Sequence, residues 1–139
     1  MSFGVSITDL KEAISLTWGL YNSLKDAPQE IKDLAKDLAT VYGVINQIQD
    51  DLNATKSNIL AHGEDRLKML QSMTQGLNAT LREVQDVVDK FRPMTEVPKS
   101  ERLWMKLKWV VSQKRIKRVR QDLSFHISAF TLLMTSMGK

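Results

Sequence analysis

The chain has 139 residues, and 20 Lys and Arg against 16 Asp and Glu give it a net charge of +4 at pH 7. This length fits one domain with a modest core, and the absence of cysteine excludes disulfides, thiol nucleophiles and cysteine–zinc sites. No apolar run approaches the roughly 20 residues that span a bilayer, and the first residues lack the pattern of a secretory signal. We therefore expect one domain over residues 1–139, located in the cytoplasm.

The first expected helix spans residues 6–25, where Ser6 or Thr8 can cap the N-terminus. Leu16 and Leu20 point away from its expected core stripe, so that apolar residues cover most of the circumference. Such a helix is either central in a bundle or able to change partners. The core stripe itself is expected to contain Ile7, Leu10, Ile14, Trp18, Tyr21 and Leu24.

The next two expected helices, at 28–62 and 64–92, follow heptad patterns that favour packing at about 20° to their neighbours. The polar stretch 53–58 can fray or kink the first of them, and Pro93 ends the second. The rows at 28–62 are Ile31, Leu38, Ile45, Leu52 and Ile59, and Leu34, Val41, Ile48 and Thr55. The rows at 64–92 are Leu70, Leu77, Val84 and Phe91, and Leu67, Thr74, Leu81 and Val88.

The last expected helix, at 100–137, is amphipathic and carries a dense basic block on the face opposite its apolar stripe. Its first two turns break this pattern, because they place further apolar residues opposite the stripe. The stripe consists of Met105, Trp109, Ile116, Val119, Leu123, Ile127, Phe130, Met134 and Met137. The surplus apolar residues are Leu103, Trp104, Leu107, Val110 and Val111.

Four amphipathic helices joined by short turns predict an all-α fold, an antiparallel four-helix bundle. The same heptads are compatible with a parallel coiled-coil dimer. Short turns favour folding back within one chain, so the bundle is the preferred prediction.

The sequence gives no pattern that supports catalysis or a bound cofactor or metal. His62 and His126 lie far apart, neither has a metal-binding spacing, and no glycine-rich phosphate loop occurs. We expect a protein that is not an enzyme and takes no small-molecule substrate. The basic block is short and the rest of the chain is acidic, so we do not expect a nucleic-acid partner either.

The net charge is distributed unevenly along the chain. Residues 1–91 contain 9 basic and 13 acidic side chains, whereas residues 92–139 contain 11 basic and 3 acidic ones. One interpretation is that the basic helix lies against acidic helices of the same chain. The other is an anionic partner, either lipid head groups or a protein domain, since tryptophan and lysine suit a membrane surface. The candidate membrane- or partner-binding residues are Leu103, Trp104, Lys106, Leu107, Lys108, Val111, Lys114, Arg115, Lys117 and Arg118.

Several short motifs resemble the N-terminal domain of fungal STAND proteins, the NOD-like receptors of filamentous fungi, in the HeLo and HeLo-like group. The resemblance covers nearly the whole chain, but relatives often carry a cysteine where this chain reads Ala61-His62-Gly63-Glu64. The motifs are Met1-Ser2-Phe3-Gly4-Val5-Ser6, Asp26-Ala27-Pro28, Trp104-x4-Trp109, Ile116-x2-Val119-Arg120-x2-Leu123 and the apolar tail.

This resemblance implies a non-catalytic signalling domain of a larger receptor, which promotes regulated cell death in incompatibility or an immune-type response. It implies self-association on activation, contact with other receptor domains, and recruitment to the plasma membrane. The alternative is a protein–protein adaptor without membrane activity. Helix one would be the effector segment, through Phe3, Val5, Ile7, Leu10, Ile14, Leu16 and Trp18.

Overall fold

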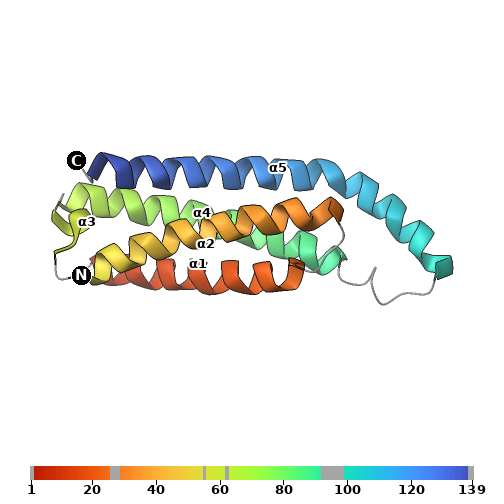
Figure 1. The fold of residues 1–139 in the computed structure, drawn as a ribbon, viewed down its shortest axis with the longest axis horizontal. Coiled ribbons are helices and arrows are strands. Elements are labelled where there is room, and N and C mark those ends of the chain that lie inside the picture. The colour runs from red at the N-terminus through yellow and green to blue at the C-terminus, as the bar shows by residue number, and fades with distance from the viewer. Residues whose placement is uncertain (1, 26–28, 55, 62, 92–98, 138–139) are drawn as a thin grey trace.

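The computed structural model contains four long helices and one short helix in the part of the chain that it describes, residues 2–25, 29–54, 56–61, 63–91 and 99–137. Side chains are described over 9–25, 32–54, 56–57, 59, 61, 63–89 and 113–136. The elements are α1 (Ser2–Leu24), α2 (Gln29–Asn53), α3 (Asn58–Ala61), α4 (Glu64–Phe91) and α5 (Lys99–Met137). The prediction of an all-α four-helix bundle is confirmed (Figure 1).

The four long helices form a square in which α1 touches α2 and α4, and α5 touches the same two helices. Among the described residues, α1 has no contact with α5. Ion pairs Arg118–Glu83 and Arg115–Asp86 show that α4 and α5 run in opposite directions. Successive long helices alternate in direction along the chain (Figure 1).

The side-by-side helices are not all antiparallel, however. The amide Nδ2 of Asn78 donates to the Asp9 carbonyl, and Arg82 pairs with Glu12, so α4 and α1 run in the same direction. Figure 1 shows the same for α2 and α5. The expected antiparallel arrangement is therefore not confirmed for every pair of neighbours. The reason is the link from α2 to α4, which crosses the bundle diagonal.

This link interrupts the helix that we predicted over 28–62. The carboxylate of Asp51, near the end of α2, accepts a hydrogen bond of 2.7 Å from the Ser57 hydroxyl and one of 3.1 Å from the Ile59 amide. These bonds satisfy groups at the start of α3 that have no partner within a helix. Gly63 then turns the chain with φ of +90°, a conformation that favours glycine.

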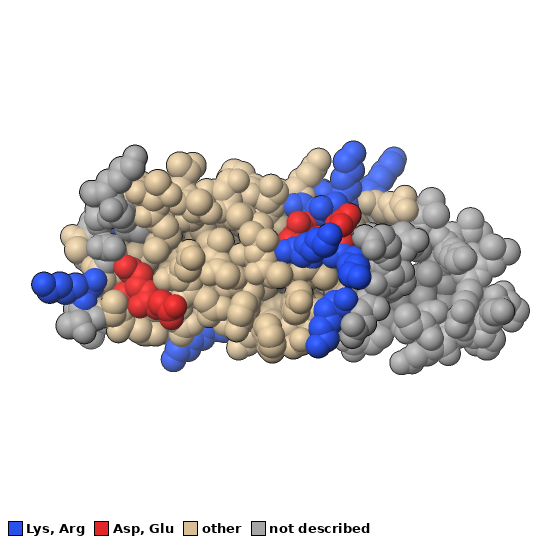
Figure 2. Space-filling view, in the orientation of Figure 1, with Lys and Arg blue, Asp and Glu red and all other residues tan. Residues whose placement is uncertain are grey.

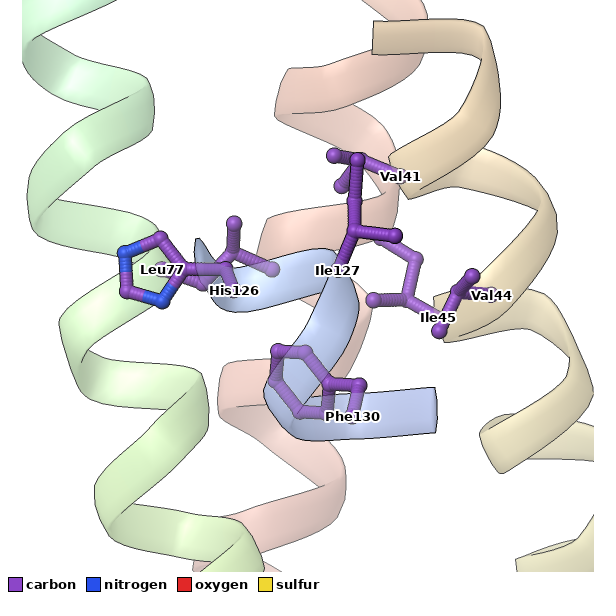
Figure 3. A pocket seen from close by; sticks show the side chains of 7 residues that line it. All are labelled: Val41, Val44, Ile45, Leu77, His126, Ile127 and Phe130. Carbon is purple, nitrogen blue, oxygen red and sulfur yellow. The ribbon is translucent and has the colours of Figure 1, made fainter. Parts of the chain in front are cut away.

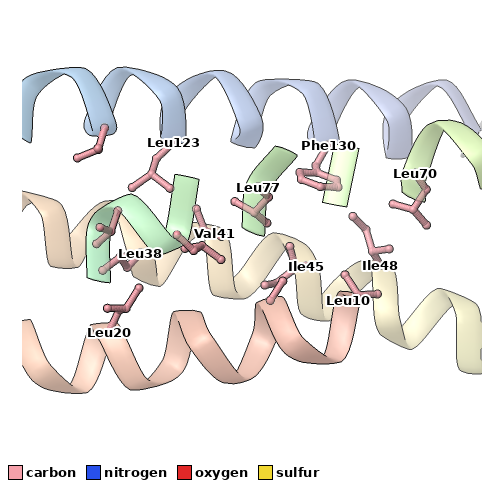
Figure 4. Close-up of a cluster of buried hydrophobic side chains, with 14 of the residues drawn as sticks. Leu10, Leu20, Leu38, Val41, Ile45, Ile48, Leu70, Leu77, Leu123 and Phe130 are labelled. Carbon is pink, nitrogen blue, oxygen red and sulfur yellow. The ribbon is translucent and has the colours of Figure 1, made fainter. Parts of the chain in front are cut away.

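The heptad rows of α2 and α4 form the centre of the core, as predicted, wherever their side chains are described. Leu38, Ile45, Leu77 and Val84 have no exposed surface, and Figure 4 shows several of these side chains pointing into the space between the helices. Thr74 occupies a core position because its hydroxyl donates to the Leu70 carbonyl at 2.8 Å.

The core stripe of α1 differs from the prediction. Trp18 is 48% exposed, although we expected it in the core, whereas Leu20, which we placed elsewhere, is 1% exposed. Ala13 and Thr17 are fully buried, and the Thr17 hydroxyl donates to the Ala13 carbonyl at 2.6 Å. Two small residues thus face the core and let α1 pack closely, which turns the bulky indole outward.

The stripe of α5 is confirmed over its described part. Val119, Leu123 and Phe130 are buried, and Ile127 and Met134 pack against them from the edge of the core.

We expect two phenylalanines of α5 to respond very differently to substitution. Phe130→Ala should lower the free energy of unfolding by about 3–5 kcal/mol, because it removes a buried ring and leaves a cavity. Phe125→Ala should change it by less than about 0.5 kcal/mol, because Phe125 is 70% exposed. Urea denaturation followed by circular dichroism measures both values. Equal losses would show that the stripe of α5 is rotated from the one described here.

Candidate membrane- and partner-binding surface

The predicted binding segment begins in a part of α5 that lies outside the body of the bundle. Figure 1 shows the first turns of α5 extending past the ends of α1, α2 and α4. The side chains of six predicted site residues there lie outside the described part of the structure: Leu103, Trp104, Lys106, Leu107, Lys108 and Val111. The same holds for Phe3, Val5 and Ile7 of the predicted effector segment.

The basic block that follows divides into two groups, of which the first is a pair of lysines. Lys114 and Lys117 are exposed, and neither forms an ion pair with a described carboxylate. They lie where α5 joins the bundle. In Figure 2, Lys and Arg side chains gather in this region, whereas most of the visible face toward the C-terminus of α5 carries no charged residue.

The second group consists of arginines that bind carboxylates of neighbouring helices. Arg115 lies 2.8 Å from Asp86, and Arg118 lies 3.1 Å from Glu83 on α4. The two arginines are three residues apart on α5, and the two carboxylates are three residues apart on α4. Because the helices are antiparallel, both ion pairs can form at once. Exposed pairs of this kind contribute at most about 1 kcal/mol each. They position the side chains more than they stabilise the fold.

A third arginine connects α5 to α2. The Arg120 guanidinium donates to the Asp37 carboxylate at 2.8 Å, and this hydrogen bond raises the pKa of Arg120, while burial acts in the opposite direction. Three arginines of the basic block thus form ion pairs with carboxylates of neighbouring helices. For these residues the first interpretation holds, in which the basic helix lies against acidic helices of the same chain. The carboxylates involved could not be chosen from sequence, because the choice depends on which helices are neighbours.

The effector segment of α1 is divided between core and surface. Leu10 is buried, and Ile14 and Leu16 are half-buried against the core. Trp18 stacks on Tyr21, with ring centroids 5.9 Å apart, and lies 5.0 Å from the ring of Tyr42 on α2. Part of the predicted segment is thus already at the surface in this structure.

A polar site between α1 and α4 lacks complementary donors. One buried carboxylate oxygen of Asp9 and the buried side-chain oxygen of Asn78 have no hydrogen-bond partner among the described residues. An unpartnered buried acceptor costs about 1–3 kcal/mol. The contact that holds α1 to α4 is therefore weaker than its apolar area alone would indicate.

His126 lies between α5 and α4, beside a shallow depression lined by Val41, Ile45 and Phe130. Its ring points toward α4 (Figure 3), where Nε2 lies 2.9 Å from the Thr80 hydroxyl. Gly76 makes room for the ring, since a Cβ there would lie 3.4 Å from the imidazole. The depression is too small to hold even a water molecule, so it is not a ligand site.

Within the described residues, no group of three or more His, Cys, Asp or Glu residues could hold a metal ion. No described helix is both long and apolar enough to cross a membrane.

The sequence matches no protein-family model, and comparison with curated proteins and with solved structures found no match. The resemblance to STAND N-terminal domains therefore stays a prediction that rests on the short motifs alone.

The His126 side chain should make stability depend on pH. Burial lowers the pKa of His126, while the Asp122 carboxylate raises it to a smaller extent. Since the folded-state pKa lies below the unfolded value of about 6.5, the unfolded chain binds more protons on acidification, and stability falls as the pH drops through this range.

We expect the wild type to lose more unfolding free energy than His126→Asn between pH 7.5 and 5. The variant keeps a polar side chain near Thr80 but does not titrate. Urea titrations at several pH values measure the difference in unfolding free energy between the two proteins. The carboxylates titrate equally in both, so their contribution cancels in this difference. Parallel curves for the two proteins would mean that His126 has the same pKa folded and unfolded.

Proposed function

We propose that this chain is a non-catalytic effector domain that binds anionic membranes and self-associates, as the N-terminal domain of a fungal NOD-like receptor. Its output would be regulated cell death, in incompatibility or an immune-type response. The observation that carries the proposal is the pair Lys114 and Lys117, exposed and without a described carboxylate partner, next to a helix segment that extends beyond the bundle. The motifs shared with STAND domains support the receptor context.

The small binding energy of one copy favours a surface that binds membranes only when several copies of the domain are held together. A lysine near an anionic membrane contributes about 1 kcal/mol, so two lysines give a weak and salt-sensitive attachment. Several copies held together by a receptor would bind far more tightly, because each further contact becomes intramolecular. Membrane attachment would then follow activation.

Helix α1 supplies a segment that could change partners on activation. Its contact with α4 contains the unpartnered oxygens of Asp9 and Asn78, and its Trp18 is already exposed. Both features lower the free energy needed to move α1 from the bundle to another surface.

A second function, that of a protein–protein adaptor, is supported by the aromatic group on the outside of α1 and α2. Trp18, Tyr21 and Tyr42 lie together, and tryptophan and tyrosine dominate the energetics of many protein interfaces. In this case the lysines would be irrelevant, and Trp18→Ala would remove partner binding.

Reversal of the two lysines tests the membrane proposal. Lys114→Glu with Lys117→Glu should weaken binding to vesicles containing phosphatidylserine by at least about tenfold, given about 1 kcal/mol per lysine. The matched control is Lys32→Glu with Lys36→Glu, which makes the same charge change on exposed residues of α2. Co-sedimentation measures binding, and phosphatidylcholine vesicles give the baseline.

The control pair should bind nearly as the wild type does. Expression of the same variants in a fungal cell, scored for death, connects vesicle binding to the biological output. If both double variants lose vesicle binding equally, the effect comes from the change in net charge and not from the position of the lysines. If the wild type does not bind vesicles, the adaptor function is favoured.

A further inference from the structure

Two large apolar residues of α5 are exposed to an unusual degree. Phe125 and Leu132 are each 70% exposed, more than Trp18 at 48% or Met69 at 47%. They lie seven residues apart, which is close to two full helical turns, so they project from the same side of α5. The buried stripe through Leu123 and Phe130 fixes this side toward solvent.

The same side of α5 carries the lysines described above. Positions 114, 117, 121, 125, 128 and 132 follow each other at intervals of three and four residues, which defines one stripe along a helix. Gln121 and Ser128, between the lysines and the apolar pair, are also exposed. We call the exposed residues Lys114, Lys117, Gln121, Phe125, Ser128 and Leu132 the outer stripe.

Negative charge is nearly absent along the outer stripe. Between residues 113 and 136 the sequence contains one acidic residue, Asp122, which is half-buried, and no charged residue follows it up to 136. Figure 2 agrees, since the visible surface over the C-terminal half of α5 shows neither acidic nor basic side chains. A surface of this composition would not repel an anionic partner anywhere along its length.

Helix α4 extends this surface. Gly76 faces His126, and the two helices are antiparallel, so Met69 lies level with the turn of α5 that contains Leu132. Ser72 and Ala79 are exposed on the same helix, and residues 69–81 carry no charge. The apolar part of the outer stripe thus adjoins a second uncharged helix surface.

We infer that the outer stripe is the face that lies on an anionic lipid bilayer, with α5 parallel to the membrane plane; this inference rests on the proposed function. The lysines contact lipid phosphates and carboxylates, while Phe125 and Leu132 insert among the upper acyl carbons. Such a division of cations and apolar anchors is typical of helices that bind in the interface. Trp18 lies on α1, which has no contact with α5 in the described part of the chain.

Charge favours lipid over a second copy of the chain as the occupant. The outer stripe carries lysines without a described carboxylate partner and no exposed carboxylate, so its charge is complementary to an anionic surface and not to itself. A protein partner would further be expected to find a pocket for its anchoring side chains. The described depression beside His126 and Phe130 has no room for such a side chain.

A single-cysteine label tests the orientation directly, because the chain contains no cysteine. Leu132→Cys carrying an environment-sensitive dye should shift its emission to the blue on phosphatidylserine vesicles. Gln47→Cys, exposed on α2, should show no shift with the same dye. In addition, Phe125→Ser with Leu132→Ser should weaken vesicle binding at least tenfold, while Ala39→Ser, at an exposed position of α2, should bind as the wild type does. Circular dichroism confirms that each variant is folded.

The outcomes separate this inference from the proposed function. If the wild type binds vesicles through its lysines but the dye at 132 stays in water and the double serine variant binds normally, the inference is overturned and the function stands. If the wild type does not bind at all, both are overturned. If the serine variant changes only the mass measured by light scattering, the outer stripe is a contact between copies of the chain, and the lipid assignment is wrong.

Discussion

Burial of the apolar stripe of α5 is the constraint on which the rest of the structure depends. Val119, Leu123 and Phe130 are held in the core without exposed surface or nearly so, and this fixes the rotation of the helix about its axis. Every other property of α5 follows from that rotation. The arginines reach the carboxylates of α4 and α2, and the lysines are left at the surface with Phe125 and Leu132. The charge pattern is thus a result of core packing.

The fold class and most of the core could be predicted from sequence because heptad spacing is a strong and local signal. In α2 and α4, each described heptad residue faces the centre, since a repeat of that period admits only one buried side. The interruption after Asn53 was also visible as a polar stretch. What the pattern could not supply was the capping role of Asp51, which acts over six to eight residues.

The contacts between side chains of different helices could not be predicted from the sequence. They depend on which helices are neighbours and on how far each helix is shifted along its axis relative to the next. The partners of Arg115 and Arg118 are an example: the residues were visible, but their pairing required the register of α4 against α5. In α1 the error had another cause. The core stripe was predicted from the helical spacing of its large apolar residues, whereas the observed core includes Ala13, Thr17 and Leu20, and Trp18 points outward.

The placement of α1 and α5 at opposite corners of the square has a consequence for the order in which the domain can come apart. Because α1 and α5 share no contact in the described part of the chain, α1 occupies a corner whose removal leaves the α2–α5 and α4–α5 interfaces in place. Here the N-terminal corner can detach as a unit from a three-helix remainder.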